Sequence, residues 1–326
     1  MAIKKANELD LTKYNVSILL DGRPGVGKTT LALSAENPLL IDIEDGVSRV
    51  EACYRRDTMQ ADRDLPDEEK YNSLINDLTH EDLSSYDTLI CDSIGKFMEI
   101  VTPVVIKENP VNAQKDGKTL SLKGYGAIAT KFKEFNKLVK SLKKDIIWIA
   151  HCTEIQDGDL VKTRIMIPGS TKDSIWDDID LGGFIEFQGK QRVIHFTPTQ
   201  SYDAKGSNGV NGTYDIPLLK DTKQGGKLED NHFIKDLITA FKNDKIQAQK
   251  QYSEGSEQYN EAMKLLPEIK AISNVDQLNE MITKLSNVKH ALTSEKELKS
   301  HFKDKVKELG ATYDKEAGKY TIVAKD

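Results

Sequence analysis

The sequence predicts an α/β fold with a mainly parallel sheet, and three features support this prediction. Short apolar runs alternate with helical patterns from residue 16 to about residue 241. The glycine-rich stretch GRPGVGKTT, at 22–30, follows one apolar run and precedes a helical pattern. Two later apolar runs lead into acidic residues, at 44 and 92. Such alternation is typical of sheets in which helices connect parallel strands, and ligands bind at the carboxyl ends of those strands.

The expected strands are short apolar runs bounded by polar or turn residues. They are 16–20, 39–43, 87–91, 146–150, 184–188 and 191–196. Gly189-Lys190 separates the last two, which predicts an antiparallel hairpin at the edge of the sheet. Between strands, apolar residues recur at spacings of three and four from Ile128 to Leu142, which predicts an amphipathic helix.

Three long polar stretches, 56–70, 107–124 and 201–231, are expected to be loops. Loops of this length are usually functional or disordered. The composition changes after about residue 243, where 244–252 reads as a linker or an extended solvated helix. We therefore expect a large domain at 1–243, a linker at 244–252 and a small, mostly helical domain at 253–326.

The last domain shows one clear helix. It starts at Ser294, where the spacing to Glu297 is that of a capping box, and Gly310 ends it. Its apolar stripe is Leu298, Phe302, Val306 and Leu309. Short runs at 312–313 and 320–323 are expected to close a hairpin behind it.

The composition of the chain excludes several classes of protein. The chain of 326 residues carries a net charge of −6, which argues against a protein that coats DNA without specificity. Six lysines within 131–144 fit the solvated face of a helix better than a basic groove. The three cysteines are far apart, which predicts a reduced, intracellular protein without a zinc site. Neither a signal peptide nor a membrane span is expected, because no apolar run approaches about 18 residues.

The stretch at 22–30 has the full spacing of a phosphate-binding loop. We expect its residues to hold the phosphates of a nucleoside triphosphate with backbone N–H groups. These residues are Gly22, Arg23, Pro24, Gly25, Val26, Gly27, Lys28, Thr29 and Thr30. Lys28 would reach the β- and γ-phosphates, and Thr29 would bind Mg²⁺.

Three polar side chains at strand ends complete the predicted site. Glu44 would orient and polarise the attacking water, or else it caps the next helix. Asp92 ends an apolar strand and would bind Mg²⁺, often through water. His151 ends the next strand, where it would sense the γ-phosphate or serve as an ordinary structural histidine.

The combination of GRPGVGKTT, LLIDIEDG, TLICDS, GYG and IAHCTE resembles bacteriophage RecA-like ATPases over roughly residues 14–220. Some members of this family act as single-strand annealing proteins. The resemblance implies a RecA-like P-loop core that binds ATP and Mg²⁺. It also implies that Glu44 matches the catalytic glutamate and His151 the sensor position.

The resemblance further implies partners and a location. Single-stranded DNA, other copies of the chain and a single-strand binding protein are the expected partners, in the cytoplasm of a bacterial host. The DNA-binding loops would lie at about 103–124 and 154–172. Their basic residues are Lys115, Lys118, Lys123, Lys162, Arg164 and Lys172. These contact DNA phosphates in this interpretation, and are exposed loop residues in the alternative.

The sequence departs from the family at one place. RecA-like motors often carry a Lys-x-Arg pair that reaches a neighbouring subunit's γ-phosphate. Here Lys205 fits, but Ser207 stands where the arginine is expected. Since an arginine finger accelerates hydrolysis by several powers of ten, a weaker ATPase is expected.

Four functions remain open on the sequence alone. The first is a DNA-dependent ATPase of phage recombination. The second is a helicase or translocase motor, for which the missing arginine is unfavourable. The third is a small-molecule kinase, and the low arginine content of 154–243 counts against it. The fourth is a nucleotide-dependent regulatory switch that does not bind DNA.

Overall fold

The computed structural model describes residues 10–158, 160–167, 171–207 and 209–322. The chain divides into two compact units, one of which spans Thr12–Asp244 while the other contains Lys245–Asp326. None of the helices in the described part of the chain combines the length and apolar character that crossing a membrane requires.

The unit Thr12–Asp244 is built on a mostly parallel sheet. Its strands are β1 (Ser17–Gly22), β2 (Pro38–Asp42), β3 (Thr58–Met59), β4 (Thr88–Asp92), β5 (Asp145–Asp157), β6 (Leu160–Ile165), β7 (Leu181–Gln188), β8 (Gln191–His195) and β9 (Thr213–Asp215). The order is β3-β2-β4-β5-β1-β7-β8-β9. The neighbours from β3 to β7 are parallel, while β8 is antiparallel to both β7 and β9. This confirms the predicted fold class, with β9 lying outside the predicted hairpin.

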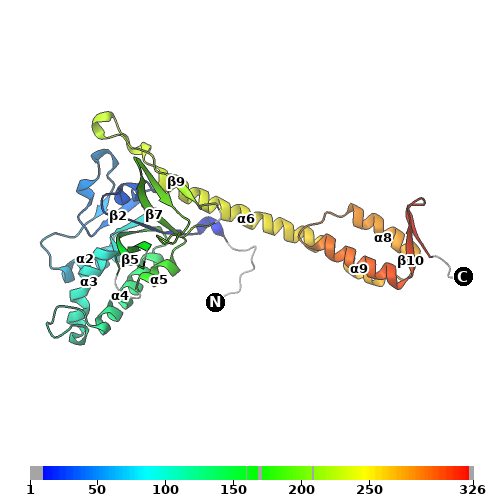
Figure 1. Cartoon of the computed structure of the whole chain (residues 1–326), viewed down its shortest axis with the longest axis horizontal. Helices are drawn as coiled ribbons and strands as arrows, with labels where there is room; N and C mark the ends of the chain where they lie inside the picture. Colours follow the sequence, from blue (N-terminus) through cyan, green and yellow to red (C-terminus); the bar gives the residue numbers. More distant parts are fainter. Residues whose placement is uncertain (1–9, 159, 168–170, 208, 323–326) are drawn as a thin grey trace. The chain divides into compact units, whose positions relative to one another are not determined.

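Helices cover both faces of the sheet. They are α1 (Lys28–Ala32), α2 (Asp67–His80), α3 (Ile94–Glu108), α4 (Leu122–Ser141), α5 (Thr171–Asp178) and α6 (Phe233–Met263). Short 3₁₀ turns occur at Leu11–Lys13, Val47–Arg49, Ala52–Tyr54, Pro110–Asn112, Thr222–Gln224 and Leu228–Asp230. Figure 1 shows α2, α3 and α4 together on one side of the strands.

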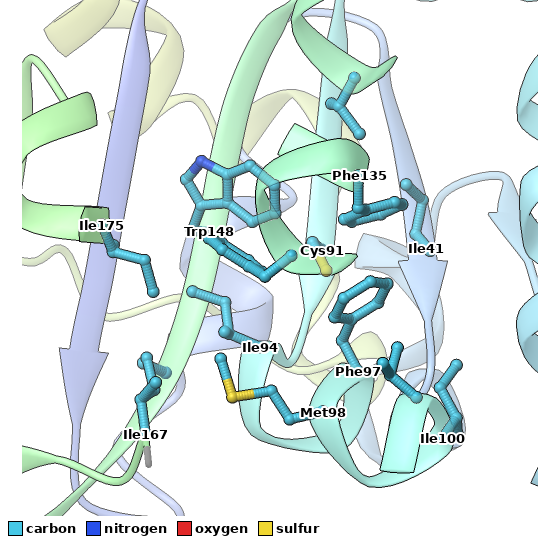
Figure 2. Packing of buried hydrophobic residues seen from close by; sticks show 14 of the residues in the cluster. Ile41, Cys91, Ile94, Phe97, Met98, Ile100, Phe135, Trp148, Ile167 and Ile175 are labelled. Carbon is cyan, nitrogen blue, oxygen red and sulfur yellow. The ribbon is translucent and has the colours of Figure 1, made fainter. Parts of the chain in front are cut away.

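Successive residues of a strand pack into two different hydrophobic cores, because their side chains point alternately to the two faces of the sheet. Leu19 packs with the side chains of α2–α5, and Figure 2 shows the centre of this core with Phe97, Phe135 and Trp148. The rings of Phe97 and Phe135 stack with centroids 4.2 Å apart. Leu20 points to the other face, where α1 and the first turns of α6 cover the sheet. The strands therefore read as continuous apolar runs, as buried parallel strands do.

Strand register brings the carboxyl ends together at one edge. In the parallel ladders Asp42 lies beside Asp92, and Gly22 lies beside both His151 and Ile185. The phosphate-binding loop and the predicted polar residues therefore share one edge of the sheet.

The structure corrects several expected boundaries. Residues 154–157 and 160–165 form the paired ends of β5 and β6, so most of the predicted loop at 154–172 is a hairpin, and 159 and 168–170 lie outside the described residues. In the predicted loop at 103–124, residues up to Glu108 belong to α3. The helical pattern after the phosphate-binding loop forms the short helix α1, which ends at Ala32, several residues before Pro38. β5 extends past the sheet because β6 returns beside it and pairs with its backbone.

The predicted linker, 244–252, is helical and lies inside α6. It has no Gly or Pro, and its Lys, Gln and Ala residues favour a helix. The second unit continues with α7 (Leu265–Ala271), α8 (Val275–Asn287), α9 (Ser294–Glu308) and the hairpin of β10 (Ala311–Asp314) and β11 (Lys319–Ile322). Its core gathers Ile269, Leu278, Leu298 and Phe302. Thr293, rather than Ser294, is the N-cap of α9, and Val323 lies outside the described residues.

Candidate functional site

The phosphate-binding loop joins β1 to α1, and two of its glycines are required by packing around it. A β-carbon on Gly22 would lie 2.5 Å from the carbonyl oxygen of Ile185 on β7. Gly27 has a φ of +84°, and a β-carbon there would lie 2.1 Å from Nη1 of Arg192. A larger residue at Gly22 would meet the backbone of β7, whereas one at Gly27 would be strained by its positive φ and would displace the side chain of Arg192.

Lys28 is held inside the loop. Its ammonium donates to the carbonyl oxygens of Gly22 and Arg23, both at 3.0 Å, and lies 3.1 Å from Nδ1 of His151. Burial lowers the pKa of Lys28, while nearby acidic groups oppose this effect. A phosphate would give this buried cation the direct anionic partner that the carbonyls only approximate.

His151 connects Lys28 to Glu44. Since an ammonium only donates, Nδ1 of His151 accepts from Lys28, and the ring proton is on Nε2. Nε2 lies 2.9 Å from Oε1 and 3.2 Å from Oε2 of Glu44. Ser93 also donates to Oε1 of Glu44. Burial works to raise the pKa of Glu44, but the hydrogen bonds from His151 and Ser93 outweigh it and lower this pKa to about 2.

The predicted magnesium ligands lie together. The hydroxyl of Thr29 donates to Oδ2 of Asp92 over 2.6 Å. Asp92 is 2% exposed, and burial raises its pKa to about 6, with the charges of Glu44 and Asp42 adding to the effect. A hydroxyl and a buried carboxylate are oxygen donors of the kind that Mg²⁺ prefers.

Magnesium would need further ligands. Within the described ranges, no cluster of three or more His, Cys, Asp or Glu side chains is arranged to hold a metal ion. The remaining ligands would be phosphate oxygens and water, which is usual for Mg²⁺ in nucleotide sites.

Asp42 serves the site indirectly. Its carboxylate accepts from the backbone N–H groups of Gly46 and Val47, both at 2.8 Å. The N–H of Ile43 donates to the carbonyl oxygen of Asp92 at 2.8 Å. These bonds fix the turn that carries Glu44 against the end of β4.

The structure does not bring Lys205 to the loop. Its ammonium donates to the carbonyl oxygens of Trp176, at 3.0 Å, and Ile179, at 2.6 Å, at the end of α5. Such contacts satisfy the free carbonyls of a helix terminus within the same chain. An action of Lys205 on a neighbouring subunit stays a prediction.

Sequence reasoning missed several groups around the loop. Ser93 supports Glu44, and the guanidinium of Arg192 lies against Gly27. Beneath the loop, the thiol of Cys152 donates to Oδ2 of Asp21 over 3.0 Å, and burial raises the pKa of Asp21 to about 7. Of these groups, only Ser93 could have been found from the sequence, because it directly follows Asp92 at the end of a predicted strand.

A cleft of about 520 Å³ opens beside Glu44 and His151. Its walls come from the phosphate loop, α3, α4 and the end of the β5–β6 hairpin. They include Pro24, Ser93, Lys96, Glu99, Tyr125 and Met166. Tyr125 is 40% exposed, so an aromatic ring faces solvent in the same cleft as the groups next to the loop.

The fold and this site define a P-loop ATPase domain, which binds ATP. Residues 14–207 match the family described as AAA domain, and this match covers more than half of the chain. The chain therefore belongs to that family.

The other comparisons are weaker. One similar solved structure is an ATPase from the type III secretion system of pathogenic bacteria, with a TM-score of 0.34 and 12% identity. The match covers 52% of this chain and 51% of that one, so the chain spans about half the length of that protein. No curated protein matches the chain.

Proposed function

We propose that this protein hydrolyses ATP and acts on single-stranded DNA in phage recombination, annealing or repair. One observation carries the proposal: Glu44 and His151 line the same cleft as Tyr125 and Met166. The groups next to the phosphate loop therefore share a cavity with an exposed aromatic side chain, which is a suitable surface for an unstacked base.

The proposed hydrolysis uses residues that already contact one another. Water adds to the γ-phosphorus while the bond to the β–γ bridging oxygen breaks, and ADP, phosphate and a proton are released. Glu44 orients the water, and Lys28 neutralises charge on the β- and γ-phosphates. Mg²⁺, held through Thr29 and Asp92, supplies further charge neutralisation when bound.

The DNA contacts are proposed mainly for the segment that leads into α4. Lys115, Lys118 and Lys123 are exposed, and none of them forms an ion pair within the described chain. The second basic segment is less available, because Lys162 pairs with Asp157 and Arg164 pairs with Asp203. Lysines that form no ion pair within the protein are the groups that gain most from DNA phosphates.

Nucleotide and DNA would be linked through His151. A γ-phosphate that draws Lys28 toward itself removes the partner of Nδ1, and Nε2 holds Glu44 in the cleft. A shift of either group changes the wall that faces Tyr125. Any such linkage is reciprocal, so DNA must also change the affinity for ATP.

The test is ATP turnover with and without a mixed-sequence single-stranded oligonucleotide, at low and moderate salt. We expect stimulation and a steep loss of affinity with salt. The Lys118→Gln/Lys123→Gln variant should bind less tightly and lower the magnitude of the log–log salt slope by about 1.4, since each phosphate contact contributes about 0.7. The matched control is Lys133→Gln/Lys137→Gln, which removes two exposed lysines further along α4.

The other functions are outcomes of the same experiment. The internal pairing of Lys162 and Arg164 favours a nucleotide switch without DNA as the second candidate. ATP hydrolysis with no DNA binding even at low salt would support that switch and refute the DNA proposal. Stimulation accompanied by duplex unwinding, rather than annealing of complementary strands, would support a motor.

A further inference from the structure

The side chain of Arg192 reaches the phosphate loop from another strand, β8. It lies near the start of β8, and because β8 runs antiparallel to β7, this end lies at the same edge as the loop. Nη1 donates to the carbonyl oxygen of Val26 over 3.3 Å. The same atom occupies the space that a β-carbon on Gly27 would need.

The guanidinium of Arg192 lacks an acidic partner. Burial lowers its pKa, and no ion pair of Arg192 occurs within the described residues. Its Nε is buried and has no hydrogen-bond partner there. Buried charges in proteins are normally paired, because an unpaired one loses its hydration without compensation. A site that holds such a cation beside a phosphate loop is suited to an anion.

The position of Arg192 indicates which part of the nucleotide it would meet. In the sheet order, β5, β4 and β2 lie on one side of β1. Asp92 ends β4, Glu44 lies just beyond β2, and His151 lies within β5, at the last residue that pairs with β1. β7 and β8 lie on the other side of β1. Since the first side takes the γ-phosphate and Mg²⁺, the side of Arg192 takes the α-phosphate and the nucleoside.

An aromatic ring lies on the same side. Phe187 is directly opposite Arg192 in the β7–β8 ladder, so both side chains project from one face of the sheet. Two residues before Phe187 on β7 and two residues after Arg192 on β8, the paired Ile185 and Ile194 pack into the core beneath α1, which identifies this face as the one that carries the loop. Phe187 is nonetheless 56% exposed, since it lies beyond the edge of that core.

We propose that Arg192 and Phe187 form the α-phosphate and nucleoside part of the ATP site. The guanidinium pairs with the α-phosphate, and the ring of Phe187 stacks on the base. A purine nucleoside 5′-diphosphate or triphosphate is the matching ligand, because its larger ring offers the greater stacking surface. The inference rests on the nucleotide binding in the proposed function, and it requires neither DNA nor hydrolysis.

Arg192 acts within its own subunit, unlike the trans-acting role expected of Lys205. It touches a phosphate that ADP and ATP share, so it strengthens the binding of both nucleotides equally. Discrimination between them is left to Lys28, His151 and Glu44.

The test measures binding of ADP, ATP and tripolyphosphate, each with Mg²⁺, to the full chain by calorimetry. Arg192→Gln should weaken ADP and ATP by the same factor, roughly tenfold to a hundredfold, as expected for the loss of a charged hydrogen bond. Phe187→Ala should weaken ADP and ATP by roughly fivefold or more and leave tripolyphosphate unchanged. Lys190→Gln, which removes an exposed charge from the turn of the same hairpin, should change none of them.

A thermal melt separates a ligand contact from a structural one. We expect Arg192→Gln without nucleotide to melt no lower than the wild type, because it removes a partly buried charge that has no acidic partner within the described residues. The rise in Tm on adding ADP should shrink. If the variant melts lower and still binds ADP as tightly as the wild type, Arg192 only supports the loop, and the inference is wrong. Equal losses for ATP and tripolyphosphate in Phe187→Ala would contradict the base contact. A wild type that binds ATP but not ADP would overturn this inference alone, and one that binds neither nucleotide would overturn the proposed function as well.

Discussion

Glu44→Gln is the substitution that most sharply separates nucleotide binding from hydrolysis. Oε1 of Glu44 accepts from Ser93 and lies 2.9 Å from Nε2 of His151. A glutamine places an amide oxygen at the same position, so both hydrogen bonds can persist. Only the negative charge and one acceptor oxygen are lost. Lys28 and Thr29, which would contact phosphate and Mg²⁺, are left unchanged.

The size of the effect follows from the surroundings of the carboxylate. The fall in the pKa of Glu44 from 4.5 to about 2 corresponds to about 3 kcal/mol of preference for the charged form. The side chain is 13% exposed, so solvent screens this preference only weakly. We therefore expect up to about 3 kcal/mol of lost stability without nucleotide. Turnover should fall by about 10² to 10⁴, as when a group that accepts a proton from water is removed.

Three measurements test this variant: phosphate release at saturating ATP, calorimetric affinity for ATP, and urea unfolding without nucleotide. Glu99→Gln is the matched control, because Glu99 lines the same cleft but pairs with Lys96 at its solvent side. The control should hydrolyse ATP normally. Wild-type turnover in Glu44→Gln would show that Glu44 is only a turn residue and would refute the proposed chemistry.

Two further predictions concern stability. Burial raises the pKa of Asp92 to about 6 and that of Asp21 to about 7, so the folded state binds these protons more tightly than the unfolded state. The free energy of unfolding should therefore fall as pH rises from 4 to 7. The expected loss is on the order of 3 kcal/mol for Asp92 alone. Unfolding midpoints across this range should become less pH-dependent in Asp21→Asn, and a flat wild-type curve would contradict the expected effect. Lys205→Met should cost about 2 kcal/mol of unfolding free energy, because two carbonyls at the end of α5 lose a charged donor, whereas Lys220→Met should cost little. If Lys205→Met instead keeps full stability and loses hydrolysis only in assemblies, the residue acts across a subunit interface.

Much of the fold was predictable because its strands are buried on both faces. Such strands read as plain apolar runs, and five of the six predicted runs lie within one or two residues of β1, β2, β4, β8 and the first part of β5. β7 begins three residues earlier than predicted, since Leu181-Gly182-Gly183 lacks a recognisable apolar pattern. The stretch 244–252 was left open between a linker and an extended solvated helix, and it is helical within α6. The β5–β6 hairpin was not predicted, because its polar residues show no apolar pattern and it is held by backbone pairing.

Part of the candidate site was also predictable from the sequence, and part was not. The sequence places Lys28, Thr29, Glu44, Asp92 and His151 at or after the ends of predicted strands, and the parallel topology brings them to one edge, where the structure places them. His151 itself lies within β5, which continues beyond it to Asp157. Arg192 could not be placed from the sequence. Its proximity to Gly27 depends on β7 pairing with β1 and on the direction of β8, and neither is visible in the residues around 192.

The central claim is that the chain Lys28–His151–Glu44 links the γ-phosphate to the cleft that receives DNA. The direct measurement is the affinity for a mixed-sequence single-stranded oligonucleotide, with Mg²⁺ and either ADP or a non-hydrolysable ATP analogue. We predict tighter binding with the analogue, by roughly fivefold to 150-fold, the usual range of coupling between sites. The difference should disappear in His151→Ala, which breaks the connection between Lys28 and Glu44. Equal oligonucleotide affinity with the two nucleotides in the wild type would contradict the claim.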